Sequence, residues 1–184
     1  MPLNFLHRSL LAAALVAMAS FAAPSAQAEE TVTLKGVHLC CDGCSAAVEK
    51  AVIATPDVKE VKCVVDGKKG TVQLKADSIE AIQAAVDAIA AAGFHGKLDT
   101  KEVKWPKAKL PKGNVELLEV EHVHNCCPAC AKAIKKALAE VEGVESDTCK
   151  PKVESFAIKG NFDPKAALKA LHKAGFHATV VADK

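Results

Sequence analysis

The sequence predicts an α+β protein built from two copies of one small unit, each in the order strand, helix, strand, strand, helix, strand. All eight cysteines fall in one pattern, C-C-x-x-C followed by a further cysteine 19 residues later. The pattern occurs twice, 86 residues apart. Around each copy, apolar residues first alternate with polar ones and then recur at helical spacing. Such self-similarity indicates duplication of one folding unit.

The first half of each unit begins with a strand that has one buried face. Val32 and Leu34 alternate with polar neighbours, and Leu118 and Val120 do the same in the second unit. A helix is expected to begin at each cysteine run, where apolar residues recur at i, i+4 and i+7. The second strand should lie at a sheet edge, because Pro151 follows the matching segment and proline cannot donate to a ladder.

The second half of each unit carries clear helix boundaries. The third strand is expected at 71–74 and at 155–158. In the first unit, Asp77 with Glu80 resembles a capping box at the start of the second helix. In the second unit, Asp163 precedes a proline at the first helical position. Gly93 and Gly175 should end these helices in the left-handed conformation, before a short last strand.

An export signal is predicted at the N-terminus. A mildly basic start precedes an apolar run from Leu10 to Ala23, and small residues supply a cleavage point before Glu29. The run is too short to span a bilayer comfortably, so we expect residues 1–28 to be removed. The mature chain would be periplasmic or secreted, with no membrane span and in an oxidising compartment.

The repeat sets the domain boundaries of the mature chain at 29–100 and 114–184. The intervening segment, 101–113, contains two prolines and five lysines and is expected to be an extended, solvated linker. Without the signal, 23 basic and 22 acidic side chains leave a formal charge of +1. That balance gives no electrostatic basis for binding nucleic acid.

At this level of detail the chain resembles a tandem pair of heavy-metal-associated domains. That family includes copper chaperones, periplasmic mercury-binding proteins and the amino-terminal modules of metal-pumping P-type ATPases. The resemblance rests on C-x-x-C after the first strand, the order of elements, and the Ala-Gly-Phe segment after the second helix. It implies two ferredoxin-like βαββαβ domains, each an antiparallel sheet with two helices on one face. The family's metal ligands fall on Cys41 and Cys44, and on Cys127 and Cys130.

The remaining thiols are additional candidate ligands. Cys40 and Cys126 stand where the family usually has a small polar residue, and Cys63 and Cys149 where it commonly has an inward apolar one. The implied fold brings these cysteines to the end of the unit that carries the metal loop. The same end should hold two repeated histidine pairs, as surface residues or as groups around the metal: His38 with His124, and His95 with His177. His122 and His172 have no counterparts and are assigned no role.

Thiolate ligands favour the soft ions Cu(I), Hg(II), Cd(II) and Zn(II). Two thiolates suit nearly linear Cu(I) or Hg(II), whereas four suit tetrahedral Zn(II). The predicted export and the family resemblance favour Cu(I). We therefore expect a protein that sequesters or shuttles this ion through its C-C-x-x-C thiolates. Its partner would be a membrane metal transporter or another metal-binding protein.

Two alternatives stay open at this stage. The cysteines could form structural disulfides in an interaction module without metal, and Cys41–Cys44 with Cys40–Cys63 is the pairing that we favour in that case. The C-x-x-C motif also occurs in thiol–disulfide redox proteins. Against that, the chain lacks a thioredoxin-like pattern and an aromatic residue before the motif. No set of residues for hydrolysis is evident either, so we expect a protein that is not an enzyme.

Overall fold

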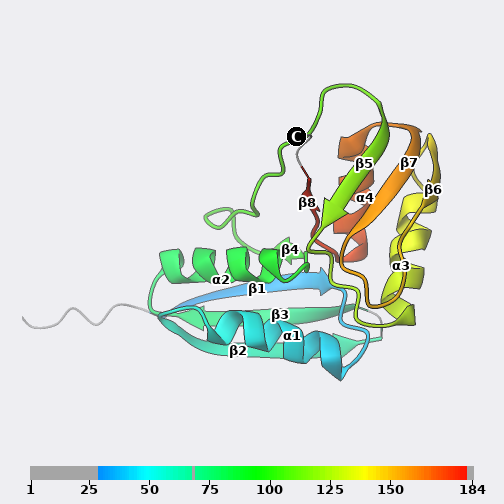
Figure 1. Ribbon diagram of the computed structural model, residues 1–184. Coiled ribbons are helices and arrows are strands. Elements are labelled where there is room, and N and C mark those ends of the chain that lie inside the picture. Colours follow the sequence, from blue (N-terminus) through cyan, green and yellow to red (C-terminus); the bar gives the residue numbers. More distant parts are fainter. Residues whose placement is uncertain (1–28, 68, 182–184) are drawn as a thin grey trace, which may run out of the picture.

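The computed structural model describes residues 29–67 and 69–181, so the predicted signal at 1–28 lies outside the described residues. It contains two four-stranded sheets, each with its own pair of helices (Figure 1). Over the described part of the chain, no helix combines the length and the apolar character needed to cross a membrane.

The first domain has the predicted order of elements. They are β1 (Glu30–Val37), α1 (Asp42–Ile53), β2 (Val58–Asp66), β3 (Lys69–Ala76), α2 (Ile79–Ala91) and β4 (Lys97–Leu98). The sheet order is β2-β3-β1-β4, and each neighbouring pair is antiparallel. The second strand therefore lies at an edge, as predicted, and β1 ends where the cysteine run begins.

The second domain repeats this topology. Its elements are β5 (Val115–Glu121), α3 (Pro128–Ala139), β6 (Val144–Asp147), β7 (Phe156–Phe162), α4 (Pro164–Ala174) and β8 (Thr179–Val180), in the sheet order β6-β7-β5-β8. The α+β class with two tandem ferredoxin-like domains is thus confirmed. Edge strand β6 stops at Asp147, before Cys149 and Pro151, so these two residues lie in the following loop rather than in the strand.

The helix caps agree with the sequence in one unit and differ in the other. Asp163 caps α4 by accepting a hydrogen bond from the Lys165 N–H at 2.9 Å, as predicted. In α2 the cap is Ser78, whose hydroxyl accepts from the Ala81 N–H at 3.2 Å, so the predicted capping box at Asp77 is wrong. Asp77 instead forms a salt bridge of 2.7 Å with Lys59 on β2.

The linker is less solvated than its composition predicts. Val103 is 2% exposed, and the Lys104 backbone exchanges two hydrogen bonds of 2.8 Å with the Gln83 side chain on α2. The Trp105 indole N–H donates to the Gly96 carbonyl at 2.9 Å. An amide side chain and an apolar contact thus hold residues 103–105 on the first domain, which the lysine content of the segment gave no reason to expect.

The two domains meet at their matching Gly-Phe-His segments. Phe94 and Phe176 form an antiparallel bridge, and both side chains are fully buried. The Gly93 carbonyl accepts from the His177 and His124 N–H groups at 2.9 and 3.4 Å. The Gly175 carbonyl accepts from the His95 and His38 N–H groups at 3.0 and 3.3 Å. Because each contact has a counterpart with the domains exchanged, the interface has approximate twofold symmetry.

Candidate metal centre

The cysteine runs sit at the N-termini of α1 and α3. Cys41 and Cys127 are the N-cap residues, with extended backbone dihedral angles, while Cys44 and Cys130 occupy the first helical turns and are fully buried. The first N–H groups of a helix have no partner within the helix and carry a partial positive charge. The cysteine runs thus lie at the electropositive ends of α1 and α3, where the sequence predicts that each helix begins.

Six of these sulfurs form one group across the domain boundary. Eight Sγ–Sγ contacts of 3.7–4.0 Å hold the group together, four within a domain and four between domains. The members are Cys40, Cys41 and Cys44 of the first domain and Cys126, Cys127 and Cys130 of the second. The two sites that the sequence predicts, one in each unit, are therefore two halves of a single cluster. The additional candidates Cys40 and Cys126 both belong to it.

The contacts are exchanged between the domains. Cys40 lies 3.8 Å from Cys127 and 3.7 Å from Cys130, and these two lie 3.7 Å apart. The symmetry-related triangle joins one thiol of the second domain to two of the first: Cys126 lies 4.0 Å from Cys41 and 3.8 Å from Cys44, which are 3.7 Å apart. Each triangle thus combines the C-x-x-C pair of one domain with the leading cysteine of the other.

Protonation of the cluster is shared between neighbouring thiols. A hydrogen bond from Cys130 lowers the pKa of Cys44, and the same hydrogen bond raises the pKa of Cys130. The backbone N–H of Cys130 lowers the pKa of Cys127 at the start of α3. Burial raises the pKa of Cys40 and of Cys126. The six thiols therefore differ in acidity, and because a metal ion binds thiolates, its binding would displace the protons that they carry.

One histidine pair flanks the sulfurs. The His124 ring lies within 4.8 Å of Cys44, Cys126 and Cys130, measured between potential ligand atoms, and His38 has the same relation to Cys40 and Cys130. The His38 ring stacks on Phe176 with centroids 4.4 Å apart, and the His124 ring on Phe94 at 4.1 Å. Each histidine is thus held against the aromatic residue of the other domain, beside the cluster.

Cys63 and Cys149 lie outside the cluster. Among the described residues, neither belongs to a group of three or more candidate ligands. The Cys63 thiol points to the Ser45 carbonyl at 4.0 Å, and the Cys149 sulfur accepts from the Asn125 amide at 3.4 Å. Burial raises the pKa of each thiol to about 11, so both remain protonated at neutral pH. These two thiols thus lie apart from the six clustered sulfurs.

The favoured disulfide pairing is also absent from this structure. All eight cysteines are free thiols. Cys41 and Cys44 lie 3.7 Å apart, well beyond the ~2.05 Å of a disulfide.

The second histidine pair forms a group separate from the sulfurs. His95 and His177 group with His172 and share no candidate ligand group with a described cysteine. Their chain neighbours Phe94 and Phe176 stack on His124 and His38 beside the cluster, so the pair lies toward the predicted end of each unit without joining the sulfurs. His172 has no counterpart in the repeat, so the repeat gives no signal for it.

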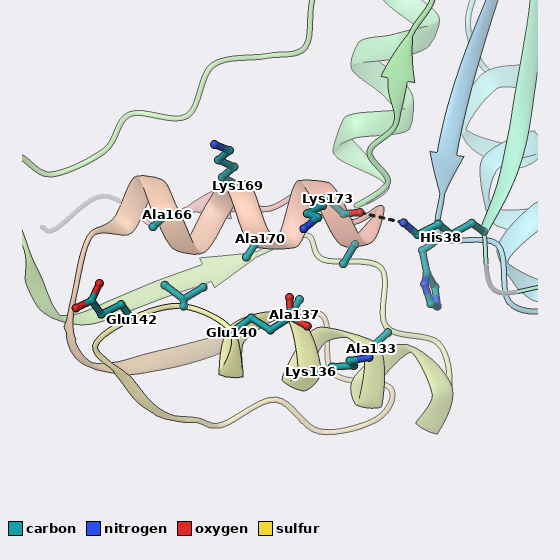
Figure 2. A pocket seen from close by; sticks show the side chains of 13 residues that line it. His38, Ala133, Lys136, Ala137, Glu140, Glu142, Ala166, Lys169, Ala170 and Lys173 are labelled. Atoms are coloured by element: carbon teal, nitrogen blue, oxygen red, sulfur yellow. Dashed lines mark hydrogen bonds between the residues drawn. The ribbon is translucent and has the colours of Figure 1, made fainter.

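A pocket of about 510 Å³ opens between α3 and α4 of the second domain (Figure 2). The facing helices present alanines, whose small side chains leave the groove unfilled, and lysines stand along its rim: Ala133, Ala137, Ala166, Ala170, Lys136, Lys169 and Lys173. His38 reaches one end of it, but no cysteine lines it.

Comparison with known proteins agrees with this architecture. A family model described as "Heavy-metal-associated domain" matches residues 31–95 and 120–177. A plant protein, heavy metal-associated isoprenylated plant protein 7 of Arabidopsis thaliana, is 37% identical over 60 residues. That match covers 32% of this chain and 17% of the plant protein.

Solved structures with two tandem domains resemble the chain less closely. The N-terminal soluble domains of Bacillus subtilis CopA share 18% identity, with coverage of 84% of this chain and 95% of that one and a TM-score of 0.32. The first two RRM domains of the yeast poly(U)-binding protein Pub1 share 8% identity, with coverage of 84% and 100% and a TM-score of 0.28. The family match includes both cysteine runs and covers more than half of the chain, and the chain therefore belongs to the heavy-metal-associated domain family.

Proposed function

We propose that this protein binds Cu(I) in one thiolate centre shared by its two domains, and that it sequesters the ion or passes it on by thiolate exchange. The family itself binds heavy-metal ions, so the proposal concerns the ion and the form of the site. The observation that carries it is the pair of sulfur triangles, each built from both domains.

The sulfur spacing favours three-coordinate or four-coordinate binding over linear binding. With a metal–sulfur bond of ~2.3 Å, three thiolates around one ion lie ~4.0 Å apart, four lie ~3.8 Å apart, and two in a line lie ~4.6 Å apart. The contacts here are 3.7–4.0 Å. The two triangles would therefore hold two trigonal Cu(I) ions, each with ligands from both domains.

The burial and softness of the sulfurs favour a soft metal ion. Cys44 and Cys130 are fully buried, and an isolated buried anion is costly unless it is compensated. Thiolates select soft ions, a class that includes Cu(I), and the predicted export and the family resemblance favour copper within that class. Hg(II), Cd(II) and Zn(II) are the other ions of that class, and Zn(II) is the competitor in the test below.

The setting of this function is also part of the proposal. The predicted signal would export the protein to the periplasm or beyond, and the acceptor would be a membrane metal transporter or another metal-binding protein. We expect no enzymatic turnover. A cluster of thiols at a domain boundary suits transfer because an incoming ligand can replace one sulfur at a time.

The test is an anaerobic Cu(I) titration of the reduced full-length protein, with X-ray absorption to count sulfur neighbours. We expect two equivalents bound tightly and about three sulfurs around each ion. The decisive variant is Cys40→Ser, in which X-ray absorption should show fewer sulfurs per copper because Cys127 and Cys130 lose their third ligand. Cys63→Ser is the matched control, since that thiol lies outside the cluster.

The proposal would fail if copper in the wild-type protein had two sulfur neighbours and Cys40→Ser left that number unchanged. Tighter binding of Zn(II) than of Cu(I) in direct competition would overturn the choice of ion.

A further inference from the structure

A second group of potential ligands lies at the domain interface, and it contains no sulfur. His95 follows α2 in the first domain, His177 is its counterpart after α4, and His172 lies in the last turn of α4. One ligand nitrogen from each ring lies within 4.8 Å of the other two. The group thus has the same two-domain origin as the thiolate cluster.

We propose that His95, His172 and His177 form a second metal site, which takes a borderline divalent transition-metal ion of the Zn(II), Co(II) or Cu(II) class. Imidazole nitrogens are the side-chain ligands that these ions favour, whereas Cu(I) favours the thiolates. Three protein nitrogens are a ligand set that zinc proteins use. This proposal is independent of the ion held by the cysteines.

The three rings offer nitrogens that nothing else occupies. His95 Nδ1, His172 Nε2 and His177 Nδ1 are buried and have no hydrogen-bond partner among the described residues. Buried ring nitrogens normally have a partner, so three of them in one place call for a ligand. Burial also lowers the pKa of all three imidazoles, which leaves them neutral at pH 7 and able to coordinate.

The backbone positions two of the ligands before any metal binds. The His95 N–H donates to the Gly175 carbonyl at 3.0 Å, and the His177 N–H donates to the Gly93 carbonyl at 2.9 Å. These bonds cross the interface, so the separation of the two rings is set by domain packing. His177 is only 6% exposed, which keeps competing water ligands few on its side.

Metal binding requires the rings to turn. At present the planes are nearly parallel, with angles of 5° between His95 and His172 and 10° between His172 and His177. Around an ion with bonds of ~2.0–2.1 Å the nitrogens would be ~3.3 Å apart, closer than the present limit of 4.8 Å. Rotation about the last side-chain torsion of histidine is soft, so the rings can converge without backbone movement.

Trp105 makes the site observable. It is the only tryptophan, and the chain has no tyrosine. Its indole stacks on His95 with centroids 4.3 Å apart and lies 5.9 Å from the His177 ring. A paramagnetic ion held by these imidazoles would quench the emission of Trp105.

The experiment uses the reduced full-length protein with its thiols first saturated with Ag(I), which is soft and does not oxidise them. Co(II) is then added while Trp105 emission and visible absorption are recorded. We expect quenching that saturates at one equivalent, with the visible bands of nitrogen-coordinated Co(II) and no sulfur-to-cobalt charge transfer. His172→Phe keeps a stacked ring but removes a ligand, and it should weaken Co(II) binding at least tenfold without changing Ag(I) uptake.

The control is His122→Asn, at a residue whose side chain is 57% exposed and whose backbone has a positive φ that asparagine tolerates. It should bind Co(II) like the wild type. Unchanged Co(II) affinity in His172→Phe would overturn the proposal. A second readout needs no variant: Zn(II) should shift the ring-nitrogen NMR signals of the three histidines together, and unshifted signals at saturating Zn(II) would equally reject the site.

Discussion

A glycine at the interface offers a way to separate the domains without touching a ligand. Gly93 has a φ of +84°, and a Cβ there would lie 2.1 Å from the His124 backbone nitrogen and 2.5 Å from the His122 carbonyl oxygen. Both atoms are backbone of the other domain and cannot move aside alone. Gly93→Ala should therefore push the domains apart, which would break the exchanged sulfur triangles.

The expected fall in Cu(I) affinity follows from the cost of the backbone conformation and from the backbone hydrogen bonds that are lost. A non-glycine residue at positive φ costs ~1–2 kcal/mol. Opening the interface also breaks four backbone hydrogen bonds, made by the carbonyls of Gly93 and Gly175. At ~0.5–1.5 kcal/mol each, these bonds contribute ~2–6 kcal/mol. If Cu(I) requires the closed arrangement, a loss of ~3 kcal/mol lowers its affinity on the order of 100-fold.

The control is Gly67→Ala, which has a similar φ of +63° but no atom within 4 Å of the added Cβ. It carries the backbone cost without the clash between domains. Cu(I) affinity is measured by competition with a colorimetric chelator, and sulfur coordination by X-ray absorption. Equal affinity in the two variants, with three sulfurs per copper in both, would refute the shared centre.

Two further predictions concern stability of the reduced, metal-free protein. Asn125→Leu removes amide bonds to the Lys150 and Val153 carbonyls at 2.7 and 2.9 Å, so the free energy of unfolding should fall by ~1–3 kcal/mol in urea denaturation. Burial lowers the pKa of His95 to about 3 and of His177 to about 4, from 6.5. The unfolded chain then binds protons that the folded one does not, so stability is full above pH 6.5 and falls toward pH 4. At pH 5 the loss is ~2 kcal/mol for His95, and urea midpoints of wild type and His95→Phe at pH 7.5 and 5 should show a smaller drop in the variant.

The sequence predicts the fold of each unit but not how the two units pack against each other. Alternation of apolar residues predicts β1 and β5, and the boundary of α4 at Asp163 follows from local chemistry. The cap of α2 cannot be chosen from local chemistry, because Asp77 and Ser78 are both good N-cap residues and a tertiary contact, the ion pair with Lys59, decides between them. Periodicity reports which face of an element is buried, so it can give no orientation of one domain against another.

The candidate site shows the same division. The four C-x-x-C cysteines can be found from the sequence because their spacing places them on a helix start. The exchange of Cys40 and Cys126 between the domains cannot be found in this way. Their presence where the family usually has a small polar residue is nevertheless a signal, because a site within one domain does not explain it. Comparison of the two repeats does not find His172, because that comparison favours residues that occur in both units. A site near an approximate twofold axis can include a ligand from one unit only.

Contacts within one unit explain why the duplication matters for the chemistry. In the first domain, Cys40 and Cys41 each contact Cys44 at 3.7 Å, so these two contacts form an open chain, whose end sulfurs lie within 4.8 Å of each other. The second domain has the same open chain, through Cys130. The contacts of 3.7–4.0 Å close into a triangle where the leading cysteine of one unit meets the C-x-x-C pair of the other. One unit alone thus offers a soft ion two sulfurs in the right place, and the third comes from its duplicate.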